Sequence, residues 1–174
     1  MDDDSELLKL GRSDPQAFRA LVERQSQYLY GVAHALTSNE ADAEDLVQET
    51  FLGAVKGTFR GESSVRTWLV RILVNRAAML RRMRKRKPTS QFDEAKPPSS
   101  GGGSGAEAVE AKIDLTAMLS QLSDEHRQVI VLRELEGLSY EEMAKTIGVP
   151  RGTVESRLHR AREELRKRFA GYKP

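Results

Sequence analysis

The chain has 174 residues, a length that suits one ordinary domain or two small helical ones. It contains no cysteine, which excludes disulfides and thiolate metal sites, and its three scattered histidines match no ligand spacing, so no metal or other cofactor is expected. No apolar run approaches the roughly 20 residues that cross a bilayer, and the first residues, MDDDSELLKL, are acidic where a signal peptide is basic. These features predict a cytoplasmic protein with no membrane insertion.

The net charge of +2 conceals four blocks of alternating sign. Residues 1–59 and 88–150 each carry a net charge of −6, whereas residues 60–87 carry +9 and residues 151–174 carry +5. Clustered Lys and Arg release counterions from nucleic-acid phosphates, so each basic block is a candidate polyanion-binding surface. One such run alone is usually a solvated helix face, but two runs that each end a predicted helical unit favour nucleic-acid binding. The acidic blocks favour a protein partner.

Two helices are predicted at the start of the chain. Asp14 and Pro15 give an N-cap and first-turn signal, and apolar residues at helical spacing extend this helix over residues 15–37. Ser38 is expected to cap the second helix, because acidic residues follow it in the first turn. The inward stripe of the second helix is expected to be Ala43, Leu46, Val47, Thr50, Phe51 and Ala54.

A glycine-bracketed loop and a basic helix come next. The segment GTFRG places Phe59 and Arg60 in a short loop, and Ser63 or Ser64 then caps a helix that runs into RRMRKRK and stops at Pro88. The apolar residues of this helix are Val65, Trp68, Leu69, Ile72, Leu73, Val74, Ala77, Met79 and Leu80.

This loop and helix have the character of a nucleic-acid surface. A basic amphipathic helix also fits a membrane surface, but an exposed aromatic such as Phe59 beside Arg60 is the combination that stacks an unpaired base. Asn75 is expected among apolar neighbours, where an amide is costly unless it hydrogen-bonds a group such as a base edge. The helical spacing of Trp68 favours a core position over base contact.

The composition changes sharply after the basic helix. From residue 88 to about residue 106, Pro, Ser and Gly replace the hydrophobic period, so this segment cannot bury a core. Residues 88–111 are therefore predicted to be a flexible linker between units at residues 1–87 and 112–174. Its GGGSG piece has the composition of natural linkers, which favours a natural origin over the alternative of an engineered join.

The second unit is also predicted to be helical. After the apolar residues that open it, Ser123 starts a helix that Gly137 ends, and Ser139 with Glu142 forms the capping box of the next helix. Gly148 supplies the positive φ that breaks this helix before GVPRGTVESRLHRAREEL. The buried stripe of that last segment is expected to be Val154, Leu158, Ala161 and Leu165. No strand of credible length is visible, so the predicted fold class is all-α, with two small helical domains.

Two short helices joined by a tight glycine turn are typical of a helix-turn-helix, whose second helix lies in the major groove. Arg160 is expected to contact DNA, because Arg paired to guanine is the commonest specific contact. Arg157 lies nearer the flank and fits a phosphate clamp. For His159, an ordinary exposed position and a base contact stay equally open. The outward side consists of Gly152, Ser156, His159, Arg160 and Glu163.

Long stretches of the chain resemble a known family. They are NEADAEDLVQETFLGA with FRGESSVRTWLVRILVN, and LSDEHRQVIVLRELEGLSYEEMAKTIGVPRGTVESRLHRAREEL. They resemble regions 2 and 4 of the extracytoplasmic-function (ECF) class of bacterial sigma factors, and the resemblance covers all but the linker and the termini. It implies a region 2 domain at residues 1–87 and a region 4 helix-turn-helix domain at residues 112–174. It also implies a promoter-specificity subunit of RNA polymerase with no catalytic residues of its own.

The resemblance also implies partners and contact residues. Core RNA polymerase is expected to bind this chain through the clamp helices of its largest subunit and the flap of its second-largest subunit. Both domains of this chain are expected to bind promoter DNA. An anti-sigma factor commonly covers the same surfaces, holding such a protein near the membrane and away from the nucleoid. The implied polymerase contacts are Asp45, Gln48 and Glu49. The implied minus-ten contacts are Phe59, Arg60, Arg66, Asn75 and Arg76. The implied minus-thirty-five contacts are Arg151, Thr153, Ser156, Arg157, His159 and Arg160.

The sequence departs from the family pattern at two places. Glu155 stands where the family often has Lys or Arg, which removes a phosphate attraction and offers cytosine an acceptor. Val55 and Lys56 replace a common aromatic-containing pair, so the packing beneath the loop is expected to differ.

Two other classes of protein compete with the sigma-factor interpretation. A stand-alone transcriptional regulator is the alternative, since the second unit also resembles the DNA-binding domain of response-regulator effectors. The short first unit is not a receiver or ligand-binding domain, which favours a sigma factor. An enzyme ranks third, because the sequence shows no phosphate-binding loop, catalytic triad or metal cluster.

Overall fold

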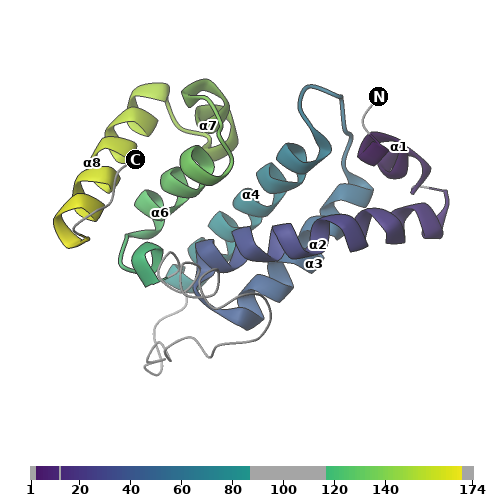
Figure 1. The fold of residues 1–174 in the computed structure, drawn as a ribbon, viewed down its shortest axis with the longest axis horizontal. Coiled ribbons are helices and arrows are strands. Elements are labelled where there is room, and N and C mark those ends of the chain that lie inside the picture. Colours follow the sequence, from purple (N-terminus) through teal and green to yellow (C-terminus); the bar gives the residue numbers. More distant parts are fainter. Residues whose placement is uncertain (1–2, 12, 87–116, 170–174) are drawn as a thin grey trace.

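The computed structural model describes residues 3–11, 13–86 and 117–169. These ranges contain helices and no strand, which confirms the all-α fold class (Figure 1). The linker predicted at residues 88–111, with its GGGSG piece, lies outside the described residues. Within the described part, no helix combines the length and the apolarity that a membrane span needs.

The first unit is a bundle of four helices. They are α1 (Asp3–Leu10), α2 (Pro15–Thr37), α3 (Glu40–Lys56) and α4 (Val65–Arg86). α2 has the predicted bounds and the predicted cap, since the Asp14 carboxylate accepts from the Gln16 N–H at 2.8 Å. α4 is capped by Ser64 rather than Ser63, because the Ser64 hydroxyl accepts from the Thr67 N–H at 3.1 Å.

The cap predicted at Ser38 is wrong. Ser38 ends α2 in the left-handed conformation, with φ 53°, and its N–H donates to the His34 carbonyl. Asn39 is the N-cap of α3, and its side chain accepts from the Asp42 N–H at 2.9 Å. Left-handed residues other than glycine are more often Asn than Ser, so residue preferences point to the opposite assignment here.

α1 is an element that the sequence pattern does not predict. Its eight residues are mostly polar, and the helix is held to α2 by tertiary contacts. Leu8 is buried, and the Asp3 carboxylate pairs with Arg24 of α2. The Gln25 side chain, 2% exposed, donates to the Asp4 carboxylate. A helix this short is marginal alone and depends on such packing.

The core of the first unit includes the inward stripe predicted for α3. On α3, five of the six predicted inward residues are buried and Val47 is half-buried. On α4 the side chain of Met79, one of the apolar residues of this helix, is 57% exposed. Met79 lies at the margin of the buried face, on the same side as the half-buried Trp68 and Ile72. The buried residues of α4 are Val65, Leu69, Val70, Leu73, Val74 and Ala77.

The second unit begins with a helical turn at residues 117–120. The elements after it are α6 (Asp124–Ile130), the π-helix η1 (Val131–Leu135), α7 (Tyr140–Ile147) and α8 (Arg151–Arg168). The single helix predicted between Ser123 and Gly137 is therefore divided in two. The Glu136 N–H donates to the Val131 carbonyl, five residues back, at 3.2 Å. Gly137 then ends the element with φ 65°.

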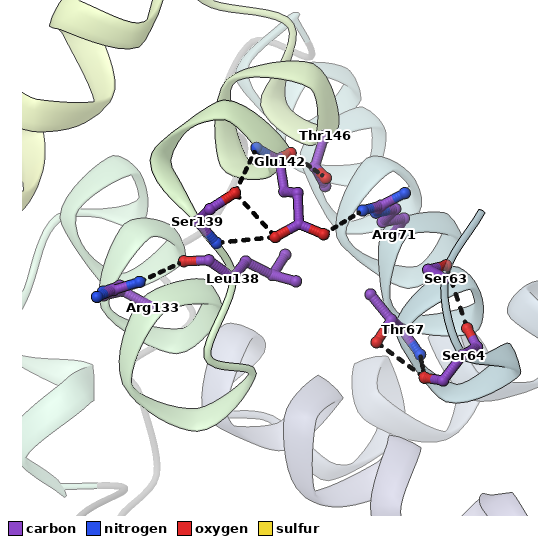
Figure 2. Close-up of polar contacts among 9 residues, drawn as sticks. All are labelled: Ser63, Ser64, Thr67, Arg71, Arg133, Leu138, Ser139, Glu142 and Thr146. Carbon is purple, nitrogen blue, oxygen red and sulfur yellow. Dashed lines mark hydrogen bonds and ion pairs between the residues drawn. The ribbon is translucent and has the colours of Figure 1, made fainter.

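The helix-turn-helix is confirmed in its local details. The Ser139 hydroxyl accepts from the Glu142 N–H at 3.3 Å, while the Glu142 carboxylate accepts from the Ser139 N–H at 2.9 Å (Figure 2). Gly148 ends α7 in the left-handed conformation, with φ 73°. All four residues of the stripe predicted for α8 are buried. The turn and the inward face of α8 are thus those that the sequence predicts.

The two units pack against each other. α4 lies beside α7, and α2 lies beside α6 and η1 (Figure 1). The Arg127 side chain, 8% exposed, donates to the Leu36 carbonyl of α2 at 2.9 Å. The same guanidinium donates to the carbonyls of Leu119, Ser120 and Leu122. Arg127 therefore hydrogen-bonds the first turn of the second unit and links it to the end of α2.

We expect Arg127→Met to destabilise the protein by about 2–4 kcal/mol, because four backbone carbonyls lose their donor in a buried place. Urea denaturation followed by circular dichroism measures this loss. Arg19→Met is the control, since Arg19 is exposed on α2 and pairs with Glu23 of the same helix. Equal midpoints for the two variants would show that the Arg127 contacts contribute little.

Candidate nucleic-acid and polymerase interfaces

The loop between α3 and α4 places two aromatic rings together. The Phe59 and Trp68 centroids are 5.4 Å apart, with the ring planes at 60°. Both residues are half-buried against the core, as predicted for Trp68, whereas Phe59 is less exposed than expected. A Cβ atom on Gly57 would lie 3.1 Å from Trp68 Cζ2, so this position favours glycine. Arg60 is exposed beside the pair.

Asn75 is exposed on α4, so the expectation of apolar neighbours is wrong. It lies outside the arc of α4 that contains the buried residues, and its amide needs no internal partner. Arg76, the next residue, is half-buried, and its Nη1 lies 3.8 Å from Glu49 Oε2 of α3. The argument that a buried amide needs a partner therefore does not apply to Asn75. Its exposure leaves the amide accessible to a ligand.

Arg66 is held by α2 at the start of α4. Its Nε donates to the Gln25 amide oxygen at 3.2 Å, and its guanidinium lies 4.6 Å from the centroid of the Tyr28 ring. The Tyr28 hydroxyl donates in turn to Glu136 Oε1 at 2.9 Å, across the boundary between the units. The exposed side chain of Arg66 thus contacts two residues of α2.

Much of the positive charge of residues 60–87 is balanced inside the molecule. On the α3 side, Arg84 forms two hydrogen bonds with the Asp42 carboxylate. On the side of the second unit, Arg71 pairs with Glu142 and Arg81 with Asp124. The charge of +9 therefore overstates what the closed molecule presents to a polyanion.

Two of these groups have shifted pKa values. Burial lowers the pKa of Arg81, and the charge of Asp124 opposes that shift. The hydrogen bond from the Ser139 N–H is the largest cause of the lowered pKa of Glu142, followed by the bond from the Ser139 hydroxyl. Glu142 is thus ionised at neutral pH and serves both its helix cap and Arg71.

α3 presents the three predicted polymerase contacts on one exposed face. Asp45, Gln48 and Glu49 are all exposed and follow helical spacing. Leu52, one turn further along, is 62% exposed, and the sequence analysis does not assign it to this face. The sequence pattern that could have assigned Leu52 to this face is the i, i+3, i+4, i+7 spacing of these four residues. The face combines acidic groups with an exposed apolar side chain, which suits a protein partner.

The N-terminal half of α8 holds the predicted minus-thirty-five contacts. Arg151 donates from Nε to Glu155 Oε1 at 2.7 Å and pairs with Glu141 of α7. The hydrogen bond to Glu155 is the first cause of the raised pKa of Arg151. Thr153 is half-buried, and Ser156 is exposed, with its hydroxyl donating to the Gly152 carbonyl at 2.8 Å. Part of the acceptor capacity of Glu155 is thus already used.

The next turn of α8 carries its most accessible groups. His159 and Arg160 are exposed, and neither has a side-chain partner within the part of the chain that the structure describes. Arg157 is only partly exposed, and its Nη2 lies 3.0 Å from Glu125 Oε1 of α6. His159 and Arg160 lie on the side of α8 opposite the buried stripe, whereas Arg157 lies at its flank.

The fold and these surfaces define a two-unit helical protein whose second unit is a helix-turn-helix. Two family models match the chain: Sigma-70 region 2 over residues 21–87 and Sigma-70, region 4 over residues 112–165. The ECF RNA polymerase sigma-E factor of Escherichia coli strain K12 is 38% identical over 172 residues, which cover 90% of this chain and 88% of the relative. The chain therefore belongs to the ECF RNA polymerase sigma factors, a family of transcription initiation factors.

Further comparisons agree with this assignment. The ECF RNA polymerase sigma factor SigE of Mycolicibacterium smegmatis is 38% identical over 157 residues, or 84% of this chain. The chain spans only 59% of the length of that relative. The sigma factor RpoE of Bartonella quintana, solved with the anti-sigma factor NepR, matches with a TM-score of 0.62, 29% identity and coverage of 86% and 94%. CnrH, solved with the cytosolic domain of CnrY, matches with a TM-score of 0.64, 29% identity and coverage of 95% and 96%.

The raised pKa of Tyr28 predicts that the folded protein loses stability at alkaline pH. Burial, followed by the hydrogen bond to Glu136, raises the pKa of Tyr28 from 10.0 to about 12. The unfolded phenol ionises first, so this stabilisation is complete below about pH 10 and is lost as the pH rises to about 12. We expect Tyr28→Phe to lose less stability than the wild type over this range, measured by urea denaturation. Tyr140→Phe is the control, and it should follow the wild type.

Proposed function

We propose that the chain binds core RNA polymerase and directs it to specific promoters, reading the minus-thirty-five element with α8 and opening DNA at the minus-ten element with the α3–α4 loop and α4. The proposal is supported by membership of the ECF sigma factors and by the way the outward residues of both units gather on separate surfaces. The observation that carries it is the exposed side of α8 at His159 and Arg160, opposite a fully buried stripe.

The exposed face of α3 is the proposed polymerase contact. Asp45, Gln48 and Glu49 offer carboxylates and an amide to the clamp helices of the largest subunit, and Leu52 adds apolar area at the same face. An interface of this kind needs a desolvated apolar centre with a polar rim. The second unit, once engaged, is proposed to contact the flap of the second-largest subunit.

The aromatic pair and its basic neighbours are the proposed minus-ten site. Phe59 stacks an unpaired base of the opened strand, next to the Trp68 ring that supports it. Asn75 offers its exposed amide to a base edge, since an amide supplies both a donor and an acceptor. The guanidinium groups of Arg60, Arg66 and Arg76 hold the phosphates of the same strand.

The outward side of α8 is the proposed minus-thirty-five reader. Arg160 is assigned to a guanine and His159 to an adjoining base edge, with Ser156 and Thr153 closer to the start of the helix. Arg151 and Arg157 are assigned to phosphates, because their carboxylate partners hold them at the flanks of the reading face.

We further infer that an anti-sigma factor controls the protein. The sigma factor RpoE of Bartonella quintana, which shares this fold, forms a complex with the anti-sigma factor NepR. A partner of this class would cover the α3 face or the DNA-binding residues of this chain. The proposed place of action is the nucleoid in the cytoplasm, with the inhibited form held near the membrane.

Transcription in vitro tests the proposed function directly. Core RNA polymerase is mixed with this chain and a genomic promoter library, and the transcript starts are mapped with and without the chain. We expect a new set of starts that share two sequence elements at fixed spacing. Unchanged starts, together with failure to copurify with the core enzyme, would refute the proposal.

Two arginine variants are expected to separate base reading from phosphate binding. Arg160→Ala should weaken holoenzyme binding to a specific promoter by roughly 1–3 kcal/mol and relax one base position. Arg82→Ala, on exposed α4 surface, should weaken binding evenly across sequences and lower the slope of the salt dependence by roughly 0.9. Competition with scrambled duplex measures both. Equal losses on both DNAs for Arg160→Ala would exclude it as a reader.

A further inference from the structure

A pocket lies where the C-terminal end of α2 meets α4 and α6. Its volume is about 210 Å³, more than ten times the roughly 15 Å³ that one water needs. Leu36 of α2 and Ala77 and Leu80 of α4 supply apolar atoms to its wall, and three arginines and two aspartates supply the charged groups. The pocket is therefore large enough for a small molecule and has charged side chains to orient it.

The charges that line this pocket do not balance. Arg84 and Asp42 neutralise each other through two hydrogen bonds. The remaining charged residues of the lining are Arg81 of α4, Arg127 of α6 and a single carboxylate, that of Asp124. Two guanidinium groups thus share one carboxylate, and the lining carries a net charge of +1.

The two guanidinium groups are close enough to repel each other. Burial is the largest cause of the lowered pKa of both Arg81 and Arg127, and the charge of Asp124 opposes the shift in both. The charge of Arg81 lowers the pKa of Arg127 further. A negative charge placed between the two arginines would relieve this repulsion, and it would be screened little in a partly buried site.

Arg81 has hydrogen-bond donors to spare. Its side chain is only 19% exposed, and its Nε lies 3.8 Å from Asp124 Oδ2, which is an ion pair but too long for a hydrogen bond. No described residue accepts a hydrogen bond from its guanidinium group, which carries five N–H donors. Arg127, by contrast, already donates to four backbone carbonyls, so it contributes mainly its charge.

These features select the chemistry of the ligand. A guanidinium group binds a carboxylate or a phosphate through two parallel hydrogen bonds, which adds geometric specificity to the charge attraction. A cation would be repelled by the excess positive charge, and an apolar molecule would leave that charge unbalanced in a partly desolvated place. A small oxyanion satisfies both the free donors of Arg81 and the charge of the lining.

We propose that this pocket binds a small oxyanion, a phosphate or carboxylate compound, with Arg81 as its hydrogen-bond donor and Arg127 as the second positive charge. Because Arg81 belongs to the first unit and Arg127 to the second, the bound oxyanion stabilises the folded chain at the contact between them. The site uses none of the residues assigned above to polymerase or DNA, so the inference does not depend on the proposed function.

Thermal unfolding of the full chain is the first arm of the test, with inorganic phosphate and citrate as the probes. A ligand that binds only the folded state raises the unfolding midpoint. We expect about 10 mM of a binding probe to raise the midpoint by roughly 2–4 °C above sodium chloride of equal ionic strength. Isothermal titration calorimetry then measures the affinity and a stoichiometry of one. Tighter binding of phosphate assigns the pocket to phosphate compounds, and tighter binding of citrate assigns it to carboxylates.

Variants locate the bound ion. Arg81→Gln should weaken binding at least about 10-fold, because the charged donor is lost. Arg19→Gln is the control, since it removes the same charge at an exposed position of α2. Asp124→Asn keeps both arginines and removes the carboxylate that competes with the ligand, so it should strengthen binding by about 2- to 5-fold. This second variant tests the site even if Arg81→Gln fails to fold.

Three results would overturn the inference. The first is a wild-type midpoint that phosphate and citrate raise no further than sodium chloride does. The second is equal affinity of R81Q and R19Q, which would place the ion elsewhere on the basic surface. The third is weaker binding by D124N than by the wild type. Each of these results leaves the proposed function untouched, because transcript mapping with core RNA polymerase tests that function separately.

Discussion

Charge neutralisation of α4 on both of its sides is the constraint on which the rest of the structure depends. A helix with this density of arginine repels itself and any basic neighbour unless carboxylates lie close to it. α3 supplies Asp42 to Arg84 on one side, and the second unit supplies Glu142 to Arg71 on the other. Together with the hydrogen bond from the buried guanidinium of Arg127 to the Leu36 carbonyl, these pairs lie where α4 and α2 meet the neighbouring helices.

The same pairing connects the fold to promoter binding. Arg71 and Arg81 of α4 pair with Glu142 and Asp124 of the second unit, so part of the positive charge of α4 is neutralised where the two units meet. The outward side of α8 and the exposed part of the α3–α4 loop stay accessible in the closed form. Each exposed ion pair is weak, so a partner that binds both units with moderate affinity can open the molecule.

Features set by near neighbours in the sequence could be predicted. The Asp14 cap, the Ser139–Glu142 box and the left-handed Gly148 each depend on residues within four positions, and the structure has all three. The buried stripe of α8 follows from helical periodicity alone. Among the candidate site residues, those of α8 and α3 lie where the pattern puts them, because a single face of an amphipathic helix points outward.

Features set by distant contacts could not be predicted. α1 is fixed by Asp4 and Gln25, which are 21 residues apart, and the packing of the units by Leu36 and Arg127, which are 91 residues apart. Local composition carries no signal for such pairs. For the same reason a charge sum over a segment overstates its available charge, since the carboxylates that neutralise Arg71 and Arg81 lie in another block.

The distance between the two units is the quantity that tests this account most directly. Because the chain lacks cysteine, Gln27→Cys on α2 and Lys167→Cys on α8 give two exposed sites for a donor and an acceptor dye. Single-molecule energy transfer should show one short distance in the free chain and a clearly longer one once core RNA polymerase and a promoter are bound. The same distance in both states would contradict a closed form that opens to expose α4.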